Sequence, residues 1–349
     1  MRKLVTIRPV HEIIPIDGAD RIELAKVDGW QCVVKKGDFT VGDLGLFFEI
    51  DSILPSGDPR WDFMEARKFR VKTMKFRGVL SQGLLMPTSI LTNDEAEQLM
   101  LSPQQDIATL LGVEKYEVPV LCGAYGQQKG IFPTHLFPKT NQERIQNIPE
   151  VLSSTSIDQF EVTEKLDGTS CSIWFFVDEG LTTEDLTDPI QGRRIAEMCC
   201  RVASRNWEIK KEDDNAYTRA LNSTNLLDKL IKLNRNIAIQ GEIIGPQIQG
   251  NKYKLKVQQF YVFDIYDIDA AKYLSPKERQ KLTKDLDLLH VPVISNLDTN
   301  MTLENLLTIA ESNSRIGPMV EREGLVFKSY TDKNLRFKVI SNKFLLNNS

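Results

Sequence analysis

Histidine and cysteine are scarce in this sequence, and their arrangement excludes the common structural metal sites. The 349 residues include only three histidines and five cysteines. The cysteines show no C-x-x-C spacing, and no histidine sits near a cysteine in the sequence. A structural zinc site or a disulfide framework therefore does not fit the pattern. Such a composition is typical of a reducing compartment, so we expect the protein in the cytoplasm.

Long apolar runs and an excess of positive charge are also missing. No stretch approaches the roughly 20 apolar residues that span a membrane, and residues 1–8 lack the apolar core of a signal peptide. The formal net charge is −4, so nucleic acid would have to bind through a local basic patch. With 41% hydrophobic and 26% charged residues, the chain has a globular composition, and its length suits two domains.

The first third of the chain is rich in short strand-like segments separated by glycine turns. Apolar or alternating runs fall at residues 4–14, 22–27, 30–34 and 44–50. Many short strands with glycine turns are typical of a small barrel, so we expect an OB-like β-barrel domain over residues 1–122. A short helix is expected within it at 102–112. Residues 123–152, with several glycines and prolines and a polar tail, are expected to be the domain junction.

A basic segment at residues 67–78 stands out in this domain. A strand over residues 69–76 would place Arg70, Lys72 and Lys75 in solvent and the intervening apolar residues toward the core. One interpretation is a solvated edge strand, whose lysines deter aggregation. The other is a surface that binds polyphosphate or nucleic acid. The sequence leaves both open.

Strands alternate with helices from residue 153 to residue 349. Apolar runs predict strands at 160–163, 171–177, 237–244, 260–265, 324–329 and 336–340. Helices are expected at 190–201, 216–233, 275–289 and 302–311, the third opened by Ser275-Pro276 and the fourth by Thr302. The chain is therefore expected to be an α+β protein with a barrel domain first and a mixed domain second.

The stretch Glu164–Thr169 joins two of these strands and carries a lysine suited to nucleophilic chemistry. Burial and a nearby cation would lower the pKa of Lys165 and leave part of it neutral, as attack on phosphorus requires. Gly168 would let the turn close tightly and let a phosphate approach the backbone. The K-x-D-G pattern is short, however, and a hairpin with an exposed lysine would also produce it.

Further charged and aromatic clusters follow Lys165 along the chain. They are Ser204-Arg205-Asn206, Glu242-Ile243-Ile244-Gly245, Phe263-Asp264-Ile265, Glu323-Gly324-Leu325-Val326 and Arg336-Phe337-Lys338. Each alone could be a solvated carboxylate or a core aromatic residue. Their order and spacing after Lys165-Leu166-Asp167-Gly168 resemble the successive motifs of the covalent nucleotidyltransferase superfamily. This superfamily holds ATP-dependent RNA ligases, DNA ligases and mRNA-capping guanylyltransferases.

The domain order resembles RNA ligases of the Deinococcus–Naegleria type, which place an OB-like module ahead of a minimal nucleotidyltransferase domain. DNA ligases and capping enzymes carry an OB domain after the last motif, whereas here eleven residues follow Lys338 (349 − 338 = 11). The resemblance implies two antiparallel sheets with flanking helices over residues 153–349. It also implies ATP-dependent sealing of 3′-OH/5′-phosphate RNA nicks or ends. A DNA ligase, a GTP-specific capping-type transferase and a non-catalytic RNA-binding protein stay open as alternatives.

The resemblance assigns roles to individual residues. Lys165 would attack the α-phosphorus of ATP and form lysyl-AMP. Mg²⁺ or Mn²⁺ would be held by Asp167, Glu242 and Glu323, through water because Mg²⁺ dehydrates reluctantly. The expected ATP-binding residues are Glu164, Lys165, Gly168, Arg205, Glu242, Phe263, Glu323 and Lys338.

Within that set, the resemblance implies that Phe263 stacks on adenine and that Lys338 contacts the α-phosphate. Arg205 would reach the ribose or an RNA phosphate. The second cation of the last motif would be Arg336, where the family often has a lysine. Arginine stays charged and cannot act as a neutral base, so only charge stabilisation is left for it. RNA is the expected partner, with no membrane.

Overall fold

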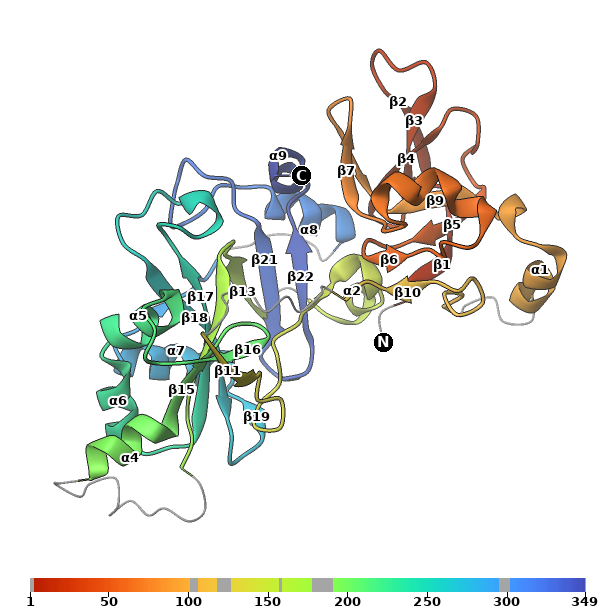
Figure 1. The fold of residues 1–349 in the computed structure, drawn as a ribbon. Coiled ribbons are helices and arrows are strands. Elements are labelled where there is room, and N and C mark those ends of the chain that lie inside the picture. The colour runs from red at the N-terminus through yellow and green to blue at the C-terminus, as the bar shows by residue number, and fades with distance from the viewer. Residues whose placement is uncertain are drawn as a thin grey trace.

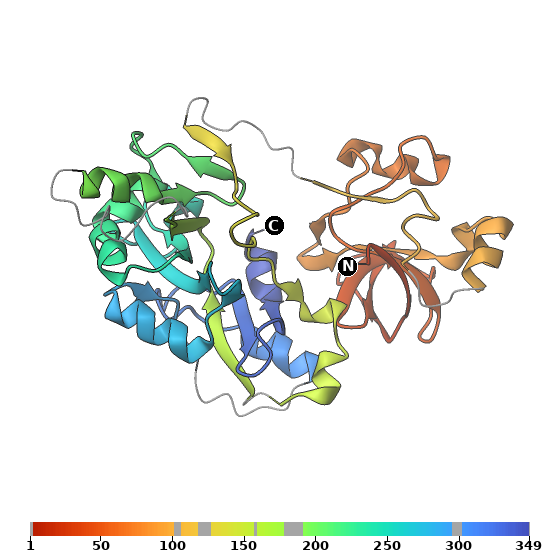
Figure 2. The ribbon, with the colours of Figure 1, turned by 90° about the horizontal axis from the view of Figure 1, so that it is seen from below.

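Two β-rich lobes lie next to each other in the molecule (Figure 1). The computed structural model describes residues 3–100, 106–117, 127–156, 159–177, 191–294 and 302–348. The smaller lobe is N-terminal, and the C-terminus lies on the side of the larger lobe that faces it (Figure 2). Within the described residues, no helix is both long and apolar enough to cross a membrane.

The smaller lobe is built from short strands, as the glycine-separated runs predict. Its strands are β1 (Val5–Pro9), β2 (Glu12–Pro15), β3 (Ile22–Val27), β4 (Trp30–Lys35), β5 (Leu44–Phe48), β6 (Ser52–Ile53), β7 (Thr73–Phe76), β8 (Val79–Gln82), β9 (Leu84–Pro87) and β10 (Glu114–Lys115). They form the sheets β1-β5-β9, β2-β3-β4, β7-β8 and β6-β10, closed over two apolar clusters. Its helical segments are η1 (Pro59–Arg67), η2 (Thr88–Ile90) and α1 (Asn93–Met100).

The basic segment of this lobe is not one continuous strand. The 3₁₀ helix η1 ends in left-handed backbone at Lys68 and Phe69, with φ of 53° and 57°. The amide of Phe69 donates back to the carbonyl of Met64, which keeps residues 68–70 in the helix end. The strand β7 therefore starts only at Thr73, and the prediction of a strand from residue 69 is wrong.

The prediction of a helix at 102–112 is also wrong for the residues of this range that the structure describes. Residues 108–112 form turns, residues 106–107 have no regular structure, and residues 102–105 lie outside the described residues. The carboxylate of Asp106 accepts the amides of Leu4 and Val5, each at 3.1 Å. The segment thus holds the start of β1 through a side chain rather than through a helix.

The expected junction contributes strands to the larger lobe. Its described residues contain β11 (Gln128–Ile131), β12 (Glu143–Arg144), η3 (Ile145–Asn147) and α2 (Val151–Ser154). Strand β11 pairs with β16 (Trp207–Ile209), and β12 pairs in parallel with β22 (Arg336–Ile340). The segment between the lobes therefore belongs to both sheets of the second lobe.

Two sheets face each other in the larger lobe. The first has the order β11-β16-β15-β14-β17-β18-β19, with β20 beside β18, and the second has the order β12-β22-β21-β13. The remaining strands are β13 (Phe160–Lys165), β14 (Thr169–Phe175), β15 (Cys200–Ala203), β17 (Ile237–Ile244), β18 (Gln259–Asp267), β19 (Lys272–Tyr273), β20 (Leu289–His290) and β21 (Gly324–Ser329). All pairs are antiparallel except β12–β22 and β18–β20.

Helices cover the outer faces of both sheets. They are α4 (Gly192–Cys199), α5 (Ala216–Ser223), α6 (Leu226–Leu233), α7 (Pro276–Asp285) and α8 (Leu303–Ala310). The chain also forms a 3₁₀ turn, η5 (Gln249–Asn251), and the helix α9 (Asn342–Asn348), which contacts β8 of the smaller lobe. Apolar residues of α4–α7 pack on the larger sheet, and those of α8 pack on the smaller one. The inner faces are thereby left to frame a site.

Two predicted helices have different ends in the structure. The helix expected at 190–201 stops at Cys199, and β15 begins at Cys200. The helix expected at 216–233 is two helices, because Asn225 adopts a left-handed φ of 52° between α5 and α6. Asparagine tolerates this conformation better than most residues, which explains the break.

Direct contacts join the two lobes. Gln82 Nε2 donates to Asn342 Oδ1 at 3.0 Å, and Asn147 Nδ2 donates to Glu49 Oε2 at 3.1 Å. The Arg144 guanidinium lies 5.4 Å from the centroid of a Trp30 ring. Polar and cation–π contacts thus connect β4, β8 and the end of β5 with the junction and α9.

Candidate active site

A cavity of about 270 Å³ opens between the inner faces of the two sheets. Thr163 and Lys165 on β13, and Val326 and Lys328 on β21, alternate along their strands and all line it. Lys338 of β22 lines it from the next strand. Since every second side chain of a strand points the same way, the strand pattern itself directs these residues inward.

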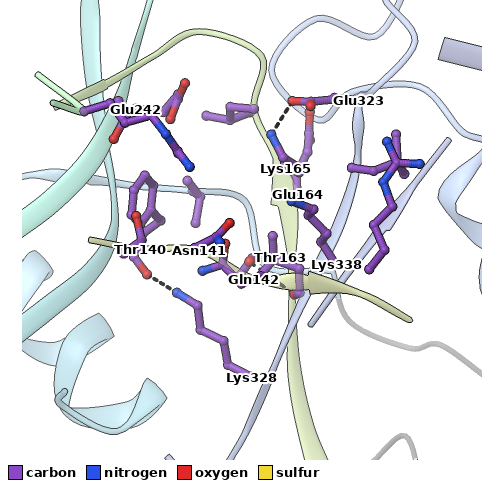
Figure 3. Close-up of a pocket in the computed structure, with 18 of the residues that line it drawn as sticks. Thr140, Asn141, Gln142, Thr163, Glu164, Lys165, Glu242, Glu323, Lys328 and Lys338 are labelled. Atoms are coloured by element: carbon purple, nitrogen blue, oxygen red, sulfur yellow. Dashed lines mark hydrogen bonds and ion pairs between the residues drawn. The ribbon is translucent and has the colours of Figure 1, made fainter. Parts of the chain in front are cut away.

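Lys165 lies at the centre of this cavity (Figure 3). Its Nζ is 2.6 Å from Glu323 Oε2. Burial lowers the pKa of Lys165, but the negative charges of Glu323, Glu242 and Asp167 outweigh burial and raise it above the usual value. The expectation of a lowered pKa is therefore wrong for the protein without ligands. The amine needs another cation near these carboxylates before it can lose its proton.

The carboxylates around Lys165 suit a divalent cation held through water. Burial, and the negative charge of Glu323, raise the pKa of Glu242 to about 7. Asp167 is close enough to act on both Lys165 and Glu242, and its own carboxylate forms an ion pair with Lys252. Among the described residues, no three acidic, histidine or cysteine side chains are grouped closely enough to ligate a metal directly. Mg²⁺ commonly keeps several waters, so the arrangement fits such an ion.

Gly168 lies outside the cavity lining and has a packing role. A Cβ at this position would lie 2.3 Å from the carbonyl oxygen of Ile243 and 2.7 Å from Ile244 Cγ2. Only glycine lets the turn after Lys165 pack this closely on β17. The prediction of a tight turn is confirmed.

The other predicted ATP-binding residues line the cavity. They are Glu164, Arg205, Glu242, Phe263, Glu323 and Lys338. Burial, with repulsion from Lys165 and Arg144, lowers the pKa of Lys338 to about 8. Glu164 is buried, and its Oε2 accepts the amide of Arg315 at 2.7 Å. Its carboxylate therefore supports the 314–316 loop.

Arg336 does not line the cavity, although it lies on β22 two residues before Lys338. Its guanidinium pairs with buried Asp264 at 3.1 Å and lies 4.0 Å from the Tyr273 ring centroid. The structure thus separates the two cations expected in the last motif. The Arg336 guanidinium is held at Asp264, the neighbour of Phe263.

Several cavity residues were missed from the sequence. Thr140, Asn141 and Gln142 cross the cavity (Figure 3). Arg144 of β12 also lines it. These residues lie in the segment expected to be a junction, and its polar composition gave no sign of a site. Lys328, whose pKa burial lowers to about 8, lies 3.0 Å from Asp264 and over the Phe263 ring. The sequence did contain a signal for Lys328. It lies three residues after the apolar Leu325 on an alternating strand, so its side chain is on the face opposite to that of Leu325.

Comparison with known proteins agrees with this architecture. A family model of an OB-fold domain matches residues 4–88, and the RNA ligase family model matches residues 158–340. No curated protein sequence matches the chain. The fold and the lysine-centred cavity thus define an RNA ligase domain preceded by an OB-fold domain.

Solved structures of Naegleria gruberi RNA ligase are similar along the whole length. A lysine-to-alanine variant with ATP and Mn and a glutamate-to-alanine variant with AMP and Mn each share 40% identity with this chain. The match covers 99% of both chains in each case, with a TM-score of 0.78. A structure of the same ligase with PPi gives 0.77. The chain belongs to the RNA ligase family and is an RNA ligase enzyme.

Proposed function

We propose that the chain is an ATP-dependent RNA ligase that seals 3′-OH/5′-phosphate nicks or ends through a lysyl-AMP at Lys165. The observation that carries this proposal is the position of Lys165 between two sheets, beside Glu323 and opposite Glu242. The similar Naegleria gruberi ligase has been solved with ATP and Mn, with AMP and Mn, and with PPi. These are the nucleotide, metal and leaving group that the mechanism needs.

Three displacements at phosphorus would complete the reaction. Lys165 Nζ attacks the α-phosphorus of ATP, so that a P–N bond forms and the bond to the pyrophosphate oxygen breaks. A 5′-phosphate oxygen of RNA then takes the AMP, and the P–N bond breaks. Finally the RNA 3′-OH attacks that 5′-phosphate, a phosphodiester bond forms and AMP leaves. Placement and charge neutralisation dominate such transfers.

The side chains that line this cavity, with Asp167 beside it, can provide both the placement and the charge neutralisation. Lys338 and Arg205 would neutralise phosphate oxygens, and Phe263 would stack on adenine. Asp167, Glu242 and Glu323 would hold Mg²⁺ or Mn²⁺ through water. When bound, the metal supplies positive charge that stabilises the α-phosphate and favours the neutral amine. The nearest base to the ammonium of Lys165 is Glu323, at 2.6 Å.

We propose an OB-fold domain at 1–122 and a ligase domain at 153–349, with junction residues 123–152 completing the cavity. Lys72 and Lys75 are exposed on the smaller lobe and would contact RNA, whereas the charge of Arg70 is balanced by Asp51 at 2.6 Å. A cytoplasmic location suits the scarcity of cysteine.

Adenylation of the purified protein tests the proposal. With ATP and Mg²⁺, intact-mass spectrometry should show one added AMP, and peptide mapping should place it on Lys165. Lys165→Ala should lose the label, and Lys256→Ala, an exposed lysine, should keep it. A preference for GTP would favour a capping-type transferase. Sealing only of nicks with deoxyribose on the 3′-OH side would favour a DNA ligase.

A further inference from the structure

A nicked duplex has two arms, and the smaller lobe is placed to meet one of them. Its strand β8 contacts α9, whose Leu345 lines the catalytic cavity. Helix α4 lies at the opposite end of the molecule from this lobe in both views (Figures 1 and 2). The second arm would extend toward that end.

A groove at that end carries an excess of positive charge. It is lined by α4, the start of β15, residues 211–212 and the facing sides of α5 and α6. Its cations are Lys129, Arg193, Arg194, Arg201 and Lys211, and its carboxylates are Glu197, Glu212 and Asp228. This local excess contrasts with the net charge of −4 of the whole chain. It is the kind of local patch that nucleic acid requires on an acidic protein.

Three of these cations are held by the protein itself. Arg193 Nη1 lies 3.1 Å from Asp228 Oδ1, and Lys129 Nζ lies 3.2 Å from Glu208 Oε1. Lys211 Nζ donates to the carbonyl of Glu197 near the end of α4. These contacts fix α4 to α6 and to the loop after β16. They build the walls of the groove.

Arg194 and Arg201 differ from the other three. Both are exposed, and neither has an ion-pair partner within the part of the chain that the structure describes. Arg201 Nε donates to the carbonyl of Met198 at 3.3 Å, and its terminal amino groups make no hydrogen bond within the described residues. An exposed guanidinium without a carboxylate partner is suited to a phosphate, which it can bind with two parallel hydrogen bonds.

One hairpin carries residues of both the groove and the cavity, although the two share no lining residue. Strands β15 and β16 are joined by the turn that carries Arg205, which lines the cavity. Arg201 lies four residues before Arg205, a distance of about 13 Å along an extended strand. That is about four to five base pairs of an A-form RNA duplex, whose base pairs are spaced more closely along the axis than those of B-DNA. If the nick of an RNA duplex lies in the cavity, one of its two arms would therefore be long enough to contact the groove.

We propose that this groove binds the phosphate backbone of one arm of the nicked RNA duplex, beginning about four to five base pairs from the nick. Arg194 and Arg201 make the phosphate contacts. The inference rests on the proposed function, because it takes the nick to lie at Lys165. It adds a second RNA surface at the end of the molecule away from the smaller lobe.

The test is RNA binding by the full chain with Arg194→Gln and Arg201→Gln combined. Fluorescence anisotropy with a nicked RNA duplex, with arms of about 12 base pairs, should show Kd increased roughly tenfold. The slope of log Kd against log salt should fall by about 2, one for each lost phosphate contact. The matched control replaces Lys277 and Lys281, two exposed lysines of α7, with glutamine. It should leave both quantities unchanged.

Arm length makes the test specific. Each arm is shortened in turn to about three base pairs; one of the two truncations should weaken the wild type and abolish its difference from the double variant. Equal binding by wild type and variant on long arms would overturn the proposal, as would a defect that persists whichever arm is shortened. Adenylation with ATP is measured in parallel and should be unchanged in the variant. A wild type that takes no AMP would instead contradict the proposed function.

Discussion

At the scale of single residues, the structure shows how closely the turn after Lys165 is packed. Lys165 is followed by a turn that packs on β17 so closely that a methyl group at Gly168 has no room. The glycine of the K-x-D-G motif is therefore required by the close contact of its backbone with β17. The position of the amine therefore depends on the distance between the turn and β17.

Gly168→Ala should destabilise the protein and slow adenylation. The new Cβ would push β17 away from the turn, and overpacking of this kind costs about 1–3 kcal/mol. The control is Gly57→Ala, because nothing lies within 4 Å of the Cβ position there and the backbone needs no positive φ. Urea denaturation and the rate of AMP incorporation check the prediction. Equal effects of the two substitutions would contradict it.

At the scale of elements, a buried charge network joins both sheets and α7 behind the cavity. Arg279 of α7 forms ion pairs with Glu161 of β13 and with Asp264 of β18, the latter at 3.5 Å. Lys328 of β21 also pairs with Asp264. Breaking such a network leaves an uncompensated buried charge, which is costly. It therefore holds the inner faces of the sheets in register around Phe263.

His290 should make this network sensitive to acid. Its Nε2 accepts Arg279 Nε at 3.1 Å, and its Nδ1 donates to the carbonyl of Val291 at 2.6 Å, so the ring is neutral. Burial and the charge of Arg279 lower the pKa of His290 to about 4, below the unfolded value of about 6.5. The contribution of neutral His290 to the free energy of unfolding is therefore fully present above pH 6.5. It is lost as the pH falls toward 4, and the free energy of unfolding then decreases by on the order of 3 kcal/mol.

Denaturation at pH 7 and pH 5 checks this prediction. The wild type should lose more stability between these values than His290→Gln, whose amide can still accept from Arg279 and donate to the Val291 carbonyl. The comparison between variants removes the contribution of other titrating groups. Identical pH dependence in the two proteins would show that His290 does not titrate with folding.

Much of the element order could be predicted from the sequence, because alternation and glycine turns are local signals. The strands at 22–27, 237–244 and 336–340 are confirmed by β3, β17 and β22. Failures came where local backbone competes with pattern, as in the left-handed residues after η1 and at Asn225. The cavity residues from the junction could not be predicted, since only tertiary pairing of β12 with β22 brings them there.

At the scale of the whole molecule, the lobes meet at a glycine. Gly29, in the turn between β3 and β4, has φ of +78°, and a Cβ there would lie 2.2 Å from Leu303 Cδ2 of α8. The turn of the smaller lobe thus packs directly on the helix that covers the smaller sheet. The relative position of the lobes depends on this contact.

Gly29→Ala should loosen the contact between the lobes. The substitution strains the backbone and collides with Leu303, so amide exchange in α8 should become faster. In a Leu303→Ala background the collision is absent and only the backbone strain is left, so the same substitution should have a smaller effect. Contacting residues usually couple by about 0.5–3 kcal/mol. An equal increase of the exchange rate in the wild-type and Leu303→Ala backgrounds would show that the effect does not depend on contact between the turn and Leu303.

The parallel pairing of β12 with β22 has a consequence for protein engineering. The polypeptide that leaves the smaller lobe forms part of the cavity wall before it reaches β13. The two lobes therefore cannot be separated at residue 153 without removing part of the cavity. A transplanted ligase core that starts at residue 153 would lack Arg144 and the crossing residues 140–142. An isolated ligase domain made from this chain must therefore begin before β11.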